Sequence, residues 1–157
     1  MEVLVFLGSS SDLEVAKGCI EVLKEFNVQH KLVVASTHRT PELVEEYLLE
    51  AEKANVKVIV AMAGMAAHLP GVIASKTLIP VIGVPISSKN TGGLDALYSI
   101  VQMPSGFPVA TVAIDGAKNA GLLAIQIIAN QRPELKKELS SYRNKMKEAV
   151  KKANKDI

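Results

Sequence analysis

Three short segments of the chain combine small residues with side chains that bind anions or transfer protons. They are residues 8–12 (Gly-Ser-Ser-Ser-Asp), residues 36–41 (Ser-Thr-His-Arg-Thr-Pro) and residues 63–71 (Ala-Gly-Met-Ala-Ala-His-Leu-Pro-Gly). Each segment directly follows a run of aliphatic residues that is typical of a buried strand. We therefore expect these three loops to hold whatever chemistry the protein performs.

The first loop has the composition of an anion site. Gly8 lets the backbone approach a ligand closely, and the serine hydroxyls beside a helix N-terminus suit a phosphate group. Asp12 would repel phosphate but suits ribose hydroxyls. The alternative is plain helix capping, in which the Asp12 carboxylate accepts free N–H groups at the start of the next helix.

The second and third loops each contain a histidine. His38 can donate and accept a proton within one catalytic cycle, and Arg39 beside it can bind a phosphate or a carboxylate. His68 lies among small residues that let a ligand lie against the backbone, so it is either a polar contact or a second proton-transfer group. The alternatives are a solvent-exposed His38 and a tight structural turn around His68.

Other chemistry has little support in the sequence. No spacing of Cys, His and carboxylate residues resembles a metal site. Cys19 lies within a helical pattern near the apolar stripe, which indicates a buried thiol and not a nucleophile. His30 lies in a polar stretch and is predicted to be a surface residue. The first loop lacks the Ser/Thr-x-Thr-Gly pattern of flavodoxins, which argues against a flavin.

The composition predicts a single domain of residues 1–157, with a catalytic core over 1–130 and a C-terminal helix over 131–157. The net charge is only +2, which argues against a nucleic-acid binder. The N-terminus lacks the basic region of a signal peptide, and no apolar run approaches the roughly 20 residues of a membrane helix. With one cysteine, the chain is expected to be cytoplasmic.

Strands and helices alternate along the chain. Helical periodicity begins at Leu13, Asp12 is expected to cap that helix, and Thr40-Pro41, Pro70 and Pro133 mark the starts of three others. A further helix, apolar nearly all round, is expected over Ala117–Ala129. This order predicts an α/β fold with three layers around an open parallel sheet of about five strands. The expected strands are Val3–Leu7, Leu32–Ala35, Val58–Met62, Val81–Val84 and Val109–Ile114.

The segment 131–157 carries nine basic and four acidic side chains, so its polar face is strongly basic. An apolar stripe runs from Leu135 to Ala153 at intervals of three or four residues, which predicts an amphipathic helix. The basic face is interrupted by glutamates and lacks aromatic residues, so we expect docking on the same or a neighbouring subunit and not on nucleic acid or a membrane.

Six motifs occur in the order found in the PurE family. Besides the three loops above, they are Gly83-Val-Pro85, Ser99-Ile-Val-Gln-Met-Pro104 and Pro108-Val-Ala-Thr-Val-Ala-Ile114. The chain resembles this family from about residue 3 to residue 130. The resemblance implies a flavodoxin-like fold, assembly as a homo-octamer with active sites between subunits, and no metal or organic cofactor.

The resemblance also implies an activity, an isomerase (mutase) of purine (IMP) biosynthesis. The reaction converts N5-carboxyaminoimidazole ribonucleotide into 4-carboxy-5-aminoimidazole ribonucleotide without ATP, which a separate synthetase consumes in the preceding step. The related alternative is a carboxylase that uses aminoimidazole ribonucleotide and free carbon dioxide, although Ala66–Pro70 favours the mutase class. A non-catalytic nucleotide-binding module is a further alternative, against which His38 beside Arg39 argues.

By motif match, the resemblance assigns roles to individual residues. His38 falls on the proton-shuttling position, and Gly64 and His68 fall in the loop that lines the carboxylate and the imidazole. Three features depart from the family pattern, namely Met62 and Met65 in the third loop, Thr37 before the histidine, and a loop at 115–118 that is about two residues short. The ribonucleotide-binding positions are matched by Ser9, Ser11, Asp12, Ser36 and Arg39.

The aliphatic content is high for so short a chain, since 48% of the residues are hydrophobic. We expect part of this apolar surface to be buried between subunits. The helix Ala117–Ala129 and the stripe Leu135–Ala153 are the expected contact surfaces.

Overall fold

The computed structural model describes residues 1–154 and contains one parallel five-stranded sheet. The strand order is β2-β1-β3-β4-β5, which is the order of flavodoxin-like folds. The predicted fold class is therefore confirmed. The strands are β1 (Val3–Leu7), β2 (His30–Val34), β3 (Val58–Gly64), β4 (Val81–Ile86) and β5 (Ala110–Thr111).

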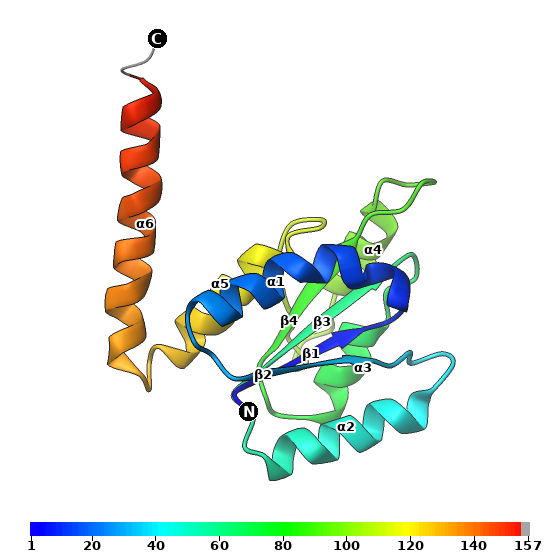
Figure 1. Ribbon diagram of the computed structural model, residues 1–157. Coiled ribbons are helices and arrows are strands. Elements are labelled where there is room, and N and C mark those ends of the chain that lie inside the picture. Colours follow the sequence, from blue (N-terminus) through cyan, green and yellow to red (C-terminus); the bar gives the residue numbers. More distant parts are fainter. Residues whose placement is uncertain (155–157) are drawn as a thin grey trace.

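Helices cover both faces of the sheet. The helices are η1 (Ser10–Asp12), α1 (Leu13–Glu25), α2 (Pro41–Lys53), α3 (Leu69–Lys76), α4 (Leu94–Val101), α5 (Ala117–Ile128) and α6 (Pro133–Ala153). In Figure 1, α1 and α5 lie together on one side of the sheet, and α2 and α3 lie on the other. The side chains of α4 join the same apolar cluster as those of α2 and α3. The result is the expected three-layer architecture.

The two apolar clusters alternate along each central strand. In β1, Val3, Val5 and Leu7 face α1 and α5, whereas Leu4 and Phe6 face the opposite layer. Because successive strand side chains point to opposite faces, a strand covered on both sides is apolar at every position. This explains why the central strands read as continuous aliphatic runs.

Several predicted boundaries shift in the structure. β2 begins at His30, two residues before the predicted start, so that histidine is half-buried and its Nδ1 lies 2.8 Å from the Val28 carbonyl oxygen. The last strand pairs with β4 only over Ala110–Thr111, since it lies at the sheet edge and the chain turns at Asp115. Helix α3 begins at Leu69, one residue before the predicted Pro70. Helix α4 was not predicted.

Asp12 and Thr40 occupy the N-cap positions of α1 and α2, as predicted, but neither side chain caps its helix. Asp12 precedes α1, but its carboxylate makes no capping bond and accepts the Ser11 hydroxyl at 3.0 Å. Thr40 precedes α2, with Pro41 at the first helical position as predicted, but the Thr40 hydroxyl binds the backbone of Ser36. In both places a nearer partner competes with the helix N–H groups for the short polar side chain.

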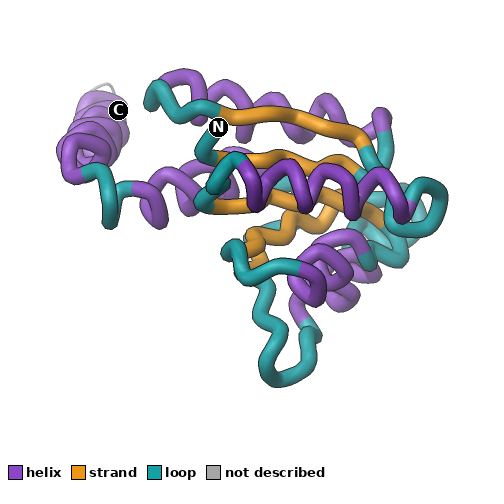
Figure 2. Tube along the Cα trace, turned by 90° about the horizontal axis from the view of Figure 1, so that it is seen from below, coloured by secondary structure: helices purple, strands orange, loops and turns teal. Residues whose placement is uncertain are grey.

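Helix α6 docks on the body of the molecule only through its first half. Leu135 and Leu139 are buried, and Tyr142 packs on Phe26 with ring centroids 5.6 Å apart. Farther along the stripe, Met146 is 57% exposed and Val150 is 64% exposed. Figure 1 shows this helix extending away from the sheet, and Figure 2 shows it nearly end-on beside the body. Residues 155–157 of the predicted C-terminal segment lie outside the described residues.

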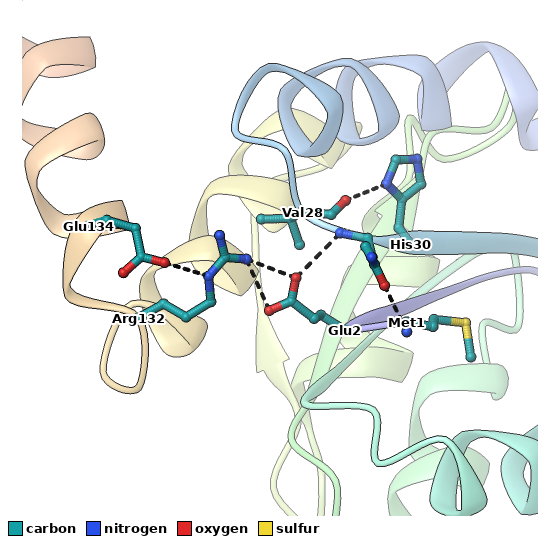
Figure 3. Close-up of polar contacts among 7 residues, drawn as sticks. Met1, Glu2, Val28, His30, Arg132 and Glu134 are labelled. Carbon is teal, nitrogen blue, oxygen red and sulfur yellow. Dashed lines mark hydrogen bonds and ion pairs between the residues drawn. The ribbon is translucent and has the colours of Figure 1, made fainter.

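An ion cluster joins the start of α6 to the start of β1 (Figure 3). The Arg132 guanidinium lies 2.9 Å from a Glu2 carboxylate oxygen and 2.8 Å from a Glu134 oxygen. Glu2 also accepts the backbone N–H of Gln29 at 3.4 Å. These contacts fix the direction in which α6 leaves the body.

No helix within residues 1–154 is long and apolar enough to span a membrane.

Because α1 packs closely on α5, we expect alanine substitutions at two glycines of this helix pair to change the stability in opposite directions. A methyl group at Gly121 would lie 2.5 Å from Val22 Cγ1 and 3.1 Å from the Cys19 carbonyl oxygen, whereas one at Gly18 would lie 3.4 Å from Lys118 Cβ. We expect Gly121→Ala to lower the free energy of unfolding by about 1–3 kcal/mol through overpacking. Gly18→Ala should raise it by roughly 0.5–1 kcal/mol through helix propensity.

Urea denaturation of the two variants beside the wild-type protein measures both effects. Gly18→Ala is the matched control, because it makes the same chemical change on the same helix pair. Equal shifts for the two variants would contradict the packing argument.

Candidate active site

A cleft of about 580 Å³ opens at the carboxyl ends of the strands. Its walls come from the loops after β1, β2, β3 and β4. This is where ligands bind in open α/β sheets, beside the point at which the strand order reverses. The structure brings all eight predicted site residues to this cleft: Ser9, Ser11, Asp12, Ser36, His38, Arg39, Gly64 and His68.

The first loop forms a short chain of hydrogen bonds along the cleft. Ser9 accepts the Ser11 backbone N–H at 3.3 Å, and its Oγ lies 2.8 Å from the Ser11 Oγ. The Ser11 hydroxyl also lies 3.0 Å from an Asp12 carboxylate oxygen. These bonds hold the hydroxyl and carboxylate groups in one place before any ligand arrives.

Asp12 is a buried carboxylate, since the residue is only 8% exposed. Burial raises the pKa of Asp12 above its ordinary value, while hydrogen bonds from Ser11 and Ser9 and the charge of Arg39 oppose the shift. Desolvation disfavours the charged form, so the protein holds this carboxylate at a cost to its own stability. A partner that donates hydrogen bonds to the carboxylate would offset that cost.

The second loop is tied to the first by Arg39. Its guanidinium donates to the Gly8 carbonyl oxygen at 2.9 Å, and both residues line the cleft. Ser36 Oγ accepts the Arg39 backbone N–H at 3.3 Å, and Thr40 Oγ1 accepts the Ser36 N–H at 2.9 Å. The cation and the hydroxyl group of this loop therefore face the same space as the serines of the first loop.

The two histidines of the cleft meet directly. His38 Nε2 and His68 Nδ1 lie 2.8 Å apart, and the rings are nearly perpendicular, with an interplanar angle of 82°. A neutral imidazole has one N–H donor and one acceptor nitrogen, so one ring must donate to the other. The pair can therefore store and pass a proton beside a bound ligand.

The third loop supplies small surfaces and one exposed apolar side chain. Ala63, Gly64 and Ala66 line the cleft, and Met65 stands at its edge with a left-handed backbone (φ 56°) and 65% exposure. Met62 is fully buried in the core on the α1 and α5 side of the sheet. Of these two methionines, only Met65 therefore borders the cleft.

The fourth wall of the cleft, which Ile86, Ser87 and Ser88 form at the end of β4, was not predicted. Its signal was available, because two hydroxyl residues follow an aliphatic strand here as they do after β1. Without a titratable group, this wall did not stand out.

The remaining candidates lie away from the cleft. Cys19 is fully buried between α1 and α5, and burial raises the pKa of its thiol to about 12, so it is not a nucleophile. His30 lies at the start of β2, whereas the cleft opens at the carboxyl ends of the strands. Over residues 1–154, no cluster of three or more His, Cys, Asp or Glu side chains could hold a metal ion.

The cleft thus combines two chemical capacities. Serine hydroxyls, Arg39 and the start of a helix can bind a phosphate, and the Asp12 carboxylate can accept hydrogen bonds from sugar hydroxyls. At the side of the third loop, two imidazoles in contact can transfer protons. A phosphorylated sugar with a reactive group at its other end fits this arrangement.

Comparisons with known proteins agree with this picture. The model of the AIR carboxylase family matches residues 2–149. The chain is 57% identical over 143 residues to N5-carboxyaminoimidazole ribonucleotide mutase of Pyrococcus abyssi. This match covers 91% of this chain and 82% of that one. It is 52% identical over 149 residues to the Saccharolobus solfataricus protein of the same name, which covers 95% and 94%.

A solved structure extends the likeness to three dimensions. The crystal structure of Treponema denticola PurE superposes with a TM-score of 0.91 at 29% identity, over 99% of this chain and 97% of that one. The resemblance inferred from the six motifs is thereby confirmed. The chain belongs to the AIR carboxylase (PurE) family.

Proposed function

We propose that the protein is an N5-carboxyaminoimidazole ribonucleotide mutase of purine biosynthesis, as the names of its relatives indicate. The reaction moves a carboxylate from the exocyclic nitrogen of the substrate to carbon 4 of its imidazole ring. The observation that carries the proposal is the His38–His68 contact, at 2.8 Å, in a cleft whose other side has the composition of a phosphate site.

The ligand lies along the cleft with its phosphate toward the loops of β1 and β2. Ser11, Ser36 and Arg39 bind the phosphate, and Asp12 accepts hydrogen bonds from the ribose hydroxyls. Burial of the Asp12 carboxylate supports this assignment, because a buried charge gains most from donors that replace water. The aminoimidazole ring then reaches the third loop, where Gly64 and His68 lie.

His38 acts first as an acid and then as a base. As imidazolium it protonates the carbamate nitrogen, the N–C bond breaks, and carbon dioxide leaves. Carbon 4 of the ring, made electron-rich by the amino group, attacks the carbon dioxide. His38 then removes the proton from carbon 4, which restores both the aromatic ring and the imidazolium. One group serves both steps because the reaction has no net proton change.

Carbon dioxide must stay beside carbon 4 between the two steps. Ala63, Gly64 and Ala66 form a wall without long polar side chains, which suits a small uncharged molecule. Holding the two reactants together replaces a bimolecular step with an intramolecular one. The contact with His68 holds the His38 ring beside this wall.

The proposal includes the protein's cellular setting. It acts in the cytoplasm without ATP or a cofactor, and it receives its substrate from an ATP-dependent synthetase. The functional unit is a homo-octamer. Support for assembly comes from α6, whose apolar stripe continues into exposed Met146 and Val150 beyond its intramolecular contacts.

The activity is tested with purified protein in the absence of ATP. We expect conversion of N5-carboxyaminoimidazole ribonucleotide to its 4-carboxy isomer. The conversion is monitored by ultraviolet absorbance. His38→Asn should slow turnover about 10²–10⁴-fold, since general acid–base groups contribute that much. Binding of the ribonucleotide to His38→Asn should survive in calorimetry, because the phosphate and ribose contacts are intact.

Two outcomes would count against these assignments. Efficient use of aminoimidazole ribonucleotide with free carbon dioxide at low bicarbonate, without use of the carbamate, would identify a carboxylase. Near-normal turnover by His38→Asn would remove His38 from the mechanism.

Asp12 should show a conflict between stability and binding. Because its pKa is raised in the folded protein, wild-type stability falls as the pH rises from the ordinary value of 3.8 through the folded pKa. Asp12→Asn removes this dependence, so its gain in unfolding free energy over wild type should grow as the pH rises above the ordinary pKa of 3.8. The same variant should bind the ribonucleotide roughly ten- to hundredfold more weakly.

Urea titrations at several pH values and calorimetry measure the two effects. A stability difference that stays constant over this pH range would contradict the burial argument.

The assembly is tested by light scattering at micromolar concentration. We expect a mass about eight times the 16.8 kDa of the chain. Met146→Glu combined with Val150→Glu should reduce that mass, because it places charges on the exposed stripe. Lys147→Glu, on another face of the same helix, is the matched control. A wild-type monomer would refute the proposal.

A further inference from the structure

The segment that follows β4 has no role in the function described above. Ile86, Ser87 and Ser88 line the cleft, and the chain then passes through a polar loop to Gly93 at the start of α4. Ser87 is exposed and Ser88 is half-buried, and the Ser88 hydroxyl lies 3.0 Å from Thr91 Oγ1, within the same segment. The question is what holds this segment against the cleft.

Asp115 provides the first tether. Its carboxylate accepts the Ser87 backbone N–H at 2.9 Å, and its own N–H donates to the Pro85 carbonyl oxygen at 2.9 Å. The residue adopts a left-handed backbone (φ 55°), which aspartate tolerates better than most residues. Asp115 therefore clasps the chain on both sides of Ile86. It lies in the turn between β5 and α5.

Backbone packing provides the second tether. Gly93 has φ 93°, and a methyl group there would lie 3.0 Å from Ser87 Cα and 2.9 Å from Ile114 Cγ2. The turn between them is closed by the Gly92 N–H, which donates to the Ser88 carbonyl oxygen at 3.0 Å. Residues 87–93 thus form a compact turn whose one side-chain anchor to the neighbouring loop is the Asp115 carboxylate.

The sheet order fixes which part of a ligand this turn meets. β4 lies beyond β3, whereas the phosphate-binding loops follow β1 and β2 on the other side. Gly64, at the end of β3, packs directly against Ile86, where a methyl group would lie 3.4 Å from the Ile86 carbonyl oxygen. The turn therefore adjoins the end of the cleft that the third loop forms.

We propose that Asp115 is a positioning residue that holds the hydroxyl groups of Ser87 and Ser88 toward the carboxylate carried by the imidazole ring. This inference rests on the proposed function, because it takes the orientation of the ribonucleotide from it. Hydroxyl donors stabilise a carboxylate but offer little to an unsubstituted ring carbon. The turn therefore distinguishes carboxylated from uncarboxylated ribonucleotides.

Two variants separate the carboxylate of Asp115 from its backbone conformation. Asp115→Gly keeps the left-handed backbone accessible but removes the acceptor for Ser87. Asp115→Asn keeps an acceptor oxygen and also tolerates the left-handed region. Calorimetry with 4-carboxy-5-aminoimidazole ribonucleotide and with 5-aminoimidazole ribonucleotide measures binding without depending on turnover.

We expect Asp115→Gly to bind the carboxylated ribonucleotide about tenfold more weakly, the size of one lost hydrogen bond. Its affinity for the uncarboxylated ribonucleotide should change less than about twofold, and Asp115→Asn should bind both like the wild type. Ser87→Ala combined with Ser88→Ala removes the hydroxyls without touching the backbone clasp. It should show the same selective loss even if Asp115→Gly does not fold.

Equal affinities of the serine double variant and the wild type for the carboxylated ribonucleotide would overturn the inference. An equal loss for both ribonucleotides would also overturn it, since it would indicate a general disturbance of the cleft. A wild-type protein that binds neither ribonucleotide would instead refute the proposed function, together with the inference that rests on it.

Discussion

The parallel pairing of β1 with β2 and β3 is the interaction on which the site depends. Val5 is paired with Leu32 on one side and Val60 on the other, so the three strands run in register toward one edge. Every loop that carries polar chemistry leaves the sheet at that edge. Groups thirty residues apart in the sequence, such as His38 and His68, therefore come into hydrogen-bonding contact.

Much of this arrangement could be predicted because burial on both faces leaves a strong trace in the sequence. A central strand such as β1 has no solvent-facing position, so it appears as an unbroken aliphatic run. Once the strands are placed, parallel topology assigns the loops that follow them to one edge. The site loops could then be recognised by their hydroxyl, imidazole and guanidinium groups, without knowledge of any distance.

The features that escaped prediction share a cause, since each depends on a choice between competing partners. The Asp12 carboxylate could bond to helix N–H groups or to the Ser11 hydroxyl, and only the folded loop decides in favour of Ser11. Thr40 makes a similar choice in favour of Ser36. The length of β5 depends on how far this edge strand stays paired with β4, its one neighbour in the sheet. The fourth wall of the cleft depends on the bond between Ser87 and Asp115, which lies in another loop.

The bond from Arg39 to the Gly8 carbonyl has a consequence for how quickly a ligand can be captured. A free arginine side chain samples many rotamers, and ordering it on binding has an entropic cost of about 0.5–1.5 kcal/mol. Here the guanidinium is already held by the first loop, at the wall of the cleft. An incoming anion meets a preformed positive surface, so the encounter is guided by charge and proceeds without a search for the right side-chain conformation.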